Sequence, residues 1–199
     1  MFPLLTREFY NRDTVEVARD LLGKHLVRVL DDGTELVCRI TETEAYVGRM
    51  DKACHAYGYK RTPRTETLFA PPGTAYIYLI YGMYHCLNFV TEPEGEPSAV
   101  LIRGANAVKN ADIISENRFH CKMADMSPYQ RRNFLNGPGK LCKGLRLTRA
   151  QNALPLTVTD SGLYVCDGPA PGKIFSGRRI GIDYAEEAVE FPWRFWTEE

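Results

Sequence analysis

The chain has 199 residues, enough for one domain with a sizeable hydrophobic core. With 44% hydrophobic and 25% charged residues it is typical of a soluble globular protein, and it lacks a stretch that resembles a membrane span or a secretory signal. The formal net charge is zero, so the chain does not belong to the strongly basic proteins that bind nucleic acid through total charge alone.

Charge is nevertheless unevenly distributed along the chain. Residues 118–149 hold eight Lys or Arg and one Asp, a net charge of +7, whereas residues 183–199 hold six acidic residues and one Arg. Either the basic segment contributes to a surface that binds a polyanion, or its charges lie on ordinary solvated helix faces.

Six cysteines are scattered along the chain without a CxxC pair, which is typical of free thiols in a reducing compartment. We therefore expect a cytoplasmic protein. Three of them have a histidine as a neighbour, but adjacent residues of a strand point to opposite faces and ligate one metal ion poorly. We expect neither a metal site nor an organic cofactor.

The first elements predicted are a helix and a β-hairpin. The helix lies between Asp13, which can cap its first turn, and Gly23, which can end it. Two strands, residues 25–30 and 35–46, follow and are joined at the turn Asp31-Asp32-Gly33.

The second of these strands carries carboxylates where apolar residues are expected. Apolar residues occupy every second position from Leu36 to Ile40, which indicates a buried face. The same alternation assigns Glu42, Glu44 and Tyr46 to that face. A buried carboxylate is costly unless it is paired, and general-base catalysis is one reason to keep it there. The alternative is a strand that leaves the core after Ile40, with both glutamates solvated.

Residues 47–73 are predicted to be irregular, because glycine and proline interrupt them repeatedly. Within them Lys60, Arg61 and Arg64 surround Thr62. This cluster suits contacts with phosphate groups, although a merely solvated loop fits the residues equally well.

A second β-hairpin is predicted from strands at residues 74–80 and 84–90. Its turn, Tyr81-Gly82-Met83, is unusual because tight turns normally carry small polar residues. The large apolar side chains predict either a wedge that inserts into a partner or a turn buried against another element.

The remaining chain predicts further strands and basic helices. A strand at 98–104 contains Arg103, a weak helix covers 107–118, and helices begin at Ser127-Pro128 and within 136–140, the last extending to about residue 147. Short strands at 155–166 and 173–182 precede an aromatic segment, 191–196, expected to pack on the core. The whole predicts a single α+β domain, residues 1–199, built on a mostly antiparallel curved sheet with surrounding helices and a protruding hairpin.

Two kinds of chemistry fit these residues. Glu42 and Glu44 would lie roughly 6.5–7 Å apart on one strand, which is compatible with a glycoside hydrolase, although such enzymes place their carboxylates on opposite sides of the substrate. The second is chemistry on a base taken out of duplex DNA. Tyrosines can stack on bases, the hairpin turn can act as a wedge, cationic groups can hold phosphates and a carboxylate can activate water.

Five segments decide between these alternatives, because together they resemble the alkyladenine (methylpurine, or 3-methyladenine) DNA glycosylase family. They are TETEAY at 41–46, KRTPR at 60–64, PGTAYIYLIYGMY at 72–84, VLIR at 100–103 and GPGKLC at 137–142. They occur in the family's order, and the resemblance covers nearly the whole chain.

The resemblance implies roles for the acidic residues and for Arg103. Glu44 matches the general base, which deprotonates a water for attack at C1′ of the flipped nucleotide. Arg103 matches the residue that helps to hold that water. Glu42 matches no catalytic position, and we expect it to have a supporting role.

The resemblance also implies a base-binding pocket. Tyr46 matches the residue that stacks on one face of the extruded base, and His55 and Tyr78 match those that cover the other face. Asn88 matches the residue that disfavours guanine through its exocyclic amine. An alkylated purine is positively charged, and its attraction to each aromatic face is worth about 0.5–2 kcal/mol.

Contacts with duplex DNA are implied at the second hairpin and at the basic helix. Tyr81 matches the side chain that fills the gap left by the flipped nucleotide. The other matching positions that contact DNA are Thr62, Met83, Tyr84 and Lys140. The implied partner is double-stranded DNA that contains damaged purines. The resemblance also implies that the protein acts as a monomer and does not associate with a membrane.

The resemblance implies hydrolysis of the N-glycosidic bond of alkylated or deaminated purines, which leaves an abasic site without strand cleavage. This is a monofunctional step of base-excision repair, carried out in the cytoplasm or, in a bacterium, at the nucleoid. The remaining alternative is a non-catalytic module that senses distorted DNA through Tyr81.

Overall fold

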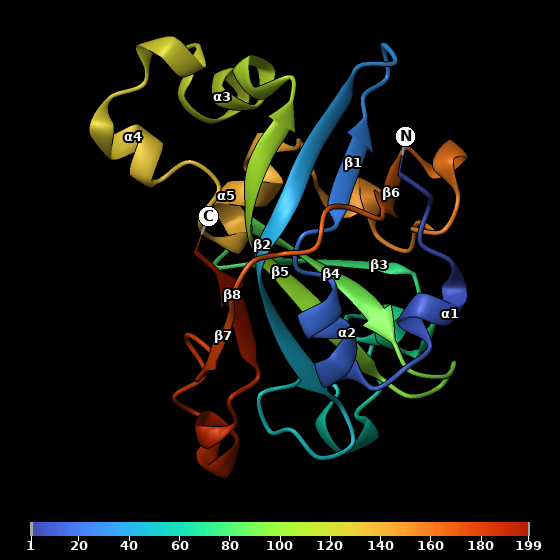
Figure 1. Ribbon diagram of the computed structural model, residues 1–199. Helices are drawn as coiled ribbons and strands as arrows, with labels where there is room; N and C mark the ends of the chain where they lie inside the picture. Colours follow the sequence, from blue (N-terminus) through green and yellow to red (C-terminus); the bar gives the residue numbers. More distant parts are fainter. Residues whose placement is uncertain (1, 199) are drawn as a thin grey trace.

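The computed structural model describes residues 2–198 as one antiparallel sheet with short helices around it, which confirms the predicted α+β fold (Figure 1). The order along the sheet is β3-β4-β5-β2-β1-β6, and β8 pairs with both β2 and β7. The strands are β1 His25–Val29, β2 Glu35–Val47, β3 Ala75–Ile80, β4 Tyr84–Thr91, β5 Ser98–Lys109, β6 Leu163–Cys166, β7 Ile174–Gly177 and β8 Arg194–Thr197.

The α-helices are short and lie around the sheet (Figure 1). As predicted, Asp13 caps the helix before the first strand, because its carboxylate accepts hydrogen bonds from two backbone N–H groups of the first turn. Ser127 likewise caps α4 in a reciprocal arrangement with Gln130. The α-helices are α1 Arg7–Tyr10, α2 Thr14–Asp20, α3 Ala111–Phe119, α4 Pro128–Arg132 and α5 Pro138–Gly144.

Strand β2 exchanges its two faces at an irregularity near Glu42, which corrects the predicted alternation. Its pairing with β5 shifts register between Ile40 and Thr43. Before the shift, even-numbered residues such as Ile40 pack in the main core; after it, Thr43 and Ala45 are the residues buried on that side. Glu44 therefore faces away from the main core, because a β-bulge reverses which side chains point to each face.

The β3–β4 hairpin protrudes with its turn exposed, so the buried alternative is wrong. Tyr81 is 82% exposed and Met83 is 68% exposed. Tyr81 adopts a left-handed backbone conformation with φ of 52°, followed by Gly82 with φ of 70°. A non-glycine residue pays about 1–2 kcal/mol for this conformation, and packing within the hairpin does not account for a large apolar side chain there.

Several boundaries predicted from the sequence were wrong. Residues 105–109 continue β5, because they pair with β2, and the predicted helix over 107–118 begins only at Ala111. The strands predicted at 155–166 and 173–182 are confined to β6 and β7, and α5 ends at Gly144. The aromatic segment 191–196 packs on the core through Trp193 and Phe195, as predicted, and its end forms β8, whose pairing with β2 covers Glu42 to Glu44.

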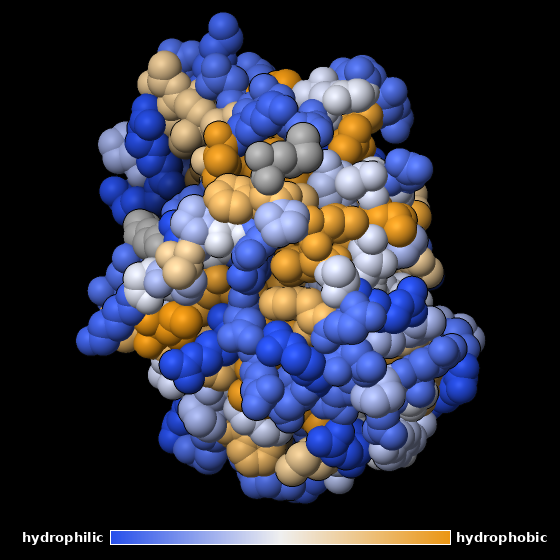
Figure 2. Space-filling model, turned by 45° about the vertical axis from the view of Figure 1, so that its right-hand side comes forward, coloured by the Kyte–Doolittle hydropathy of each residue, from blue (hydrophilic) through white to orange (hydrophobic). Residues whose placement is uncertain are grey.

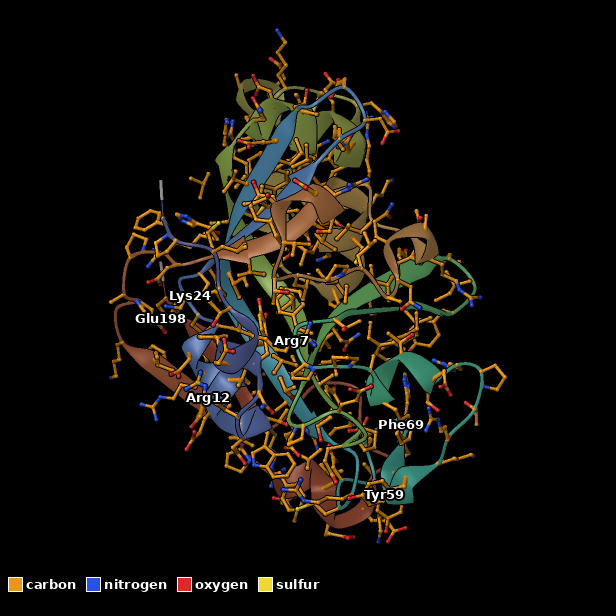
Figure 3. The ribbon with its side chains drawn as sticks, turned by 90° about the vertical axis from the view of Figure 1, so that its right-hand side faces the viewer. Arg7, Arg12, Lys24, Tyr59, Phe69 and Glu198 are labelled. Atoms are coloured by element: carbon orange, nitrogen blue, oxygen red, sulfur yellow. The ribbon has the colours of Figure 1, made fainter. Side chains whose placement is uncertain are left out.

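The molecule has distinct faces. The side that carries α1 and β6 has hydrophobic residues across its middle and hydrophilic residues over most of its lower half (Figure 2). The loops that carry Tyr59 and Phe69 lie apart from the α1–α2 segment with Arg7 and Arg12 (Figure 3). Within residues 2–198 no helix has the length and apolar character needed to cross a membrane.

Candidate active site

A pocket of about 570 Å³ lies at the base of the protruding hairpin. Its walls come from β2 to β5, the loop around residue 55, the start of α5 and the segment 180–184. The lining combines aromatic rings with the cationic side chains of Arg103, Arg118 and Lys140. The predicted site residues that line it are Tyr46, His55, Tyr78, Tyr81, Tyr84, Asn88, Arg103 and Lys140.

Glu44 lies behind this lining and is fully buried. Its Oε2 accepts a 2.7 Å hydrogen bond from the Tyr46 hydroxyl, and its Oε1 accepts one of 2.8 Å from the Ile180 backbone N–H. The Arg103 Nε lies 3.5 Å from the same Oε1. Burial raises the pKa of Glu44 above its usual value, although Arg103 and the two donors oppose the rise. All three partners line the pocket, so the buried carboxylate lies directly behind the pocket wall.

Glu42 supports Arg103 from the other side. Its Oε1 accepts hydrogen bonds from the Nε atoms of Arg103, at 3.0 Å, and of Arg194, at 2.6 Å. Arg103 therefore lies between two carboxylates, which fixes its position. The predicted supporting role of Glu42 fits this geometry. Two carboxylates bridged by one arginine do not form the facing pair of a glycoside hydrolase.

The aromatic part of the lining includes Tyr46 on β2, Tyr78 on β3 and His55 in the loop that follows β2. The His55 ring meets the Tyr78 ring edge-on at a centroid distance of 4.6 Å, and its Nδ1 lies 3.2 Å from the Tyr76 hydroxyl. Burial and the neighbouring Arg64 lower the pKa of His55 to about 4, so its ring is neutral at neutral pH. Burial also raises the pKa of Tyr78 and Tyr46, which keeps both phenols protonated.

Asn88 and Lys140 complete the polar lining. The Asn88 amide donates to the backbone carbonyls of Tyr76 and Cys86, which fixes its orientation. Lys140 donates to the side-chain oxygens of two asparagines, both at 2.9 Å. Burial and two arginines lower the pKa of Lys140.

Two predicted DNA-contacting residues lie outside the pocket lining. Met83 is on the exposed hairpin turn. Thr62 is half-buried in the loop 60–66, where its hydroxyl and that of Thr65 lie 3.1 Å apart. These positions fit contacts with an extended partner rather than with a molecule inside the pocket.

Comparison with known proteins agrees with the motifs. Residues 8–199 match the model of the family described as methylpurine-DNA glycosylase. The chain belongs to the methylpurine-DNA glycosylase family. A relative from Clostridium perfringens (strain 13 / Type A) is 50% identical over 198 residues, covering 98% of this chain and 96% of the relative. One from Methanocella arvoryzae is 49% identical over 194 residues, covering 98% and 92%. Both carry the name "Putative 3-methyladenine DNA glycosylase".

Several residues of this methylpurine-DNA glycosylase site were missed in the sequence. Arg179 is buried and lies over the Tyr46 ring, with its guanidinium carbon 4.7 Å from the ring centroid. Ile180 reaches Glu44 through its backbone, and Tyr184 and Arg118 line the pocket. The segment 179–184 carries no motif that separates it from a solvated loop, whereas Arg118 begins the basic segment 118–149 that the uneven charge had indicated.

The described residues of this family member offer acid–base chemistry in a partly closed aromatic pocket. Between residues 2 and 198 no three His, Cys, Asp or Glu side chains are gathered as a candidate metal cluster. A buried carboxylate with a raised pKa, a guanidinium beside it and aromatic rings in the pocket lining suit water activation next to a flat, electron-poor ring system.

Proposed function

We propose that this chain removes alkylated or deaminated purines from duplex DNA by hydrolysis of the N-glycosidic bond, with Glu44 as the general base. Membership of a DNA glycosylase family makes DNA the substrate class. The observation that carries the proposal is the buried Glu44 carboxylate, whose three partners all line an aromatic pocket.

In the proposed reaction, the damaged nucleotide rotates out of the duplex and its base lies between Tyr46 and the pair His55–Tyr78. Glu44 accepts a proton from a water molecule, and the oxygen of that water forms a bond with C1′. The bond between C1′ and the purine nitrogen breaks, and its electron pair leaves with the base. A purine alkylated at N3 or N7 leaves as a neutral molecule, because its ring carried a positive charge beforehand.

The hairpin turn supports the proposed base flipping. Tyr81 is 82% exposed and held in a left-handed conformation, which places a large ring at the outermost part of the protruding hairpin. A ring in this position suits the space that an extruded nucleotide leaves in the base stack. Arg118, Lys140 and the loop around Thr62 supply polar and cationic groups near the pocket for the DNA backbone.

The experiment uses duplexes with one hypoxanthine, one ethenoadenine or one 7-methylguanine, followed by alkali to cleave abasic sites. We expect alkali-dependent cleavage at the lesion. Absence of cleavage with all three, despite specific binding, would instead support the non-catalytic damage-sensing module.

A parallel reaction with borohydride tests whether the enzyme is monofunctional. Lys140 is the lysine in the pocket lining, and an amine that attacked C1′ would form an imine that borohydride traps as a protein–DNA cross-link. Two asparagine oxygens accept hydrogen bonds from its ammonium group, which disfavours that attack. We expect no cross-link.

A further inference from the structure

Arg179 makes a buried ion pair with Asp51, outside the residues that the proposed reaction uses. Both side chains have no exposed surface. The two terminal nitrogens of the guanidinium each donate to one carboxylate oxygen of Asp51. Arg178, the preceding residue, is exposed and pairs with Glu190 at the surface, so burial is specific to Arg179.

The same ion pair joins three segments of chain that form the pocket. Arg179 also donates to the backbone carbonyl of Ala45, at 2.7 Å, and of Ala188, at 3.1 Å. Ala45 lies between the proposed base and the tyrosine that stacks on the purine. Asp51 accepts hydrogen bonds from the backbone N–H groups of Val47 and Ala53, at the start of the loop that leads to His55.

Arg179 is also adjacent to both functional groups of β2. Its guanidinium carbon lies 4.7 Å from the centroid of the Tyr46 ring and 5.3 Å from that of Trp193. The next residue, Ile180, directs its backbone N–H at the Glu44 carboxylate, at 2.8 Å. Loss of the Arg179–Asp51 ion pair would therefore remove both the support of the Tyr46 ring and the Ile180 hydrogen bond to the Glu44 carboxylate.

We propose that Arg179 and Asp51 are positioning residues, and that their ion pair holds Glu44 and Tyr46 in the geometry needed for base excision. Neither residue lines the pocket. The proposal rests on the proposed function of Glu44. A purely structural role is the alternative. Buried ion pairs are often replaceable by uncharged residues without loss of stability, because the energy needed to remove two charges from water offsets their attraction.

The test is the double substitution Arg179→Met with Asp51→Asn, which removes both charges and leaves no buried ion unpaired. Asp51→Asn is not made alone, because it would leave the guanidinium without its counter-ion. The side-chain oxygen kept at position 51 can still accept from the Ala53 N–H. With protein in excess over a hypoxanthine duplex, we expect the single-turnover rate constant to fall at least about tenfold. We also expect the acidic limb of the pH–rate profile to move to higher pH, because Glu44 loses the Ile180 donor.

Arg179→Lys is the second variant. It keeps the charge and the fold but cannot make the planar two-nitrogen contact, so its rate constant should lie between those of the parent and the double variant. The control is Ile114→Ala, a fully buried residue of α3 that does not line the pocket. This variant shows how destabilisation alone affects the rate of excision. At a temperature where every protein is folded, we expect Ile114→Ala to excise with the parent's rate constant and pH profile.

The inference is overturned if folded Arg179→Lys and the double variant both excise at the parent's rate with the parent's pH profile. It is also overturned if Ile114→Ala, at equal loss of stability, slows excision as much. Failure of the proposed function has a different signature. In that case the parent protein itself does not excise any lesion, or Glu44→Gln excises as fast as the parent.

Discussion

The hydroxyl of Tyr46 donates a 2.7 Å hydrogen bond to Oε2 of Glu44, two residues earlier on the same strand. Because residues i and i+2 of a strand share a face, one β-strand presents the proposed base and the proposed stacking ring together. The hydrogen bond lowers the pKa of Glu44 against the rise caused by burial. In the proposed mechanism the phenol therefore has two roles: its ring stacks on the base, and its oxygen stabilises the ionised carboxylate.

Tyr46→Phe separates these two roles, because it keeps the ring and removes the donor. Without the hydrogen bond the pKa of Glu44 should rise further, so the rate of excision should begin to fall at a higher pH as the solution is acidified. The rate on the alkaline plateau should change by less than about tenfold. Single-turnover rates measured between pH 5 and pH 9 check this. Tyr164→Phe on β6 is the matched control, and an unshifted acidic limb in Tyr46→Phe would contradict the assignment of Glu44.

Glu44→Gln should abolish excision while the protein still binds lesion DNA. Removal of a general base costs roughly 10²–10⁴-fold in rate. The glutamine oxygen can accept from the Ile180 N–H, so the pocket should keep its shape. Excision assays beside binding measurements on a hypoxanthine duplex check the result. Joint loss of binding and excision would indicate a collapsed pocket instead of a missing base.

The same substitution should stabilise the folded protein at neutral pH. The pKa of Glu44 is raised in the folded state, so the folded protein binds the proton more tightly than the unfolded chain does. The stability that this group contributes is therefore present at low pH and is lost as pH rises through its folded-state pKa. Glutamine avoids the loss, and the midpoint of thermal unfolding at pH 7 should rise on the order of a few degrees. At a pH below the unfolded-state pKa of Glu the difference should shrink, and a constant or opposite difference would refute this explanation.

The sequence predicted those features of the site that depend on local pattern. The hairpins follow from alternation and turn residues, and the proximity of Glu44 and Tyr46 follows from their spacing. The bulge near Glu42 was not predicted, because it depends on register with β5, more than fifty residues later in the chain. Nor could Arg178 and Arg179 be distinguished. Two adjacent arginines look alike in a sequence, and only Asp51, 128 residues away, explains why one is buried.

Tyr81→Ser tests the proposed wedge. Because the side chain is 82% exposed, its loss should leave the unfolding midpoint unchanged. It should weaken capture of the flipped nucleotide, with a fall in affinity for lesion DNA equivalent to about 1–3 kcal/mol, the usual value of one base–aromatic stacking contact. Fluorescence of 2-aminopurine beside the lesion reports flipping directly. Phe2→Ser, which removes another exposed ring near the amino end, is the control. Equal flipping by Tyr81→Ser and the parent would exclude the wedge.

The pKa of His55 should depend on Arg64. Burial is the larger cause of its fall to about 4, and the charge of Arg64 is the second. The guanidinium of Arg64 lies with one nitrogen 3.5 Å from Nε2 of His55 and with its carbon 5.2 Å from the centroid of the Tyr78 ring. Arg64→Gln removes the charge and keeps much of the length, so the pKa should rise above 4 but stay below 6.5, since burial remains.

The chain has four histidines, and NMR titration of their C2 protons, assigned with His55→Gln, measures this pKa. Arg61→Gln is the matched control, because Arg61 lies in the same loop but pairs with Glu66. The lowered pKa of His55 also sets how stability depends on pH. His55 is neutral in the fold and has a lower pKa there than in the unfolded chain, so stability is lost as pH falls from about 6.5 towards 4. Arg64→Gln should reduce that loss. An unchanged His55 pKa in Arg64→Gln would show that burial alone keeps the ring neutral, and an equal shift in Arg61→Gln would show that the effect is not specific to Arg64.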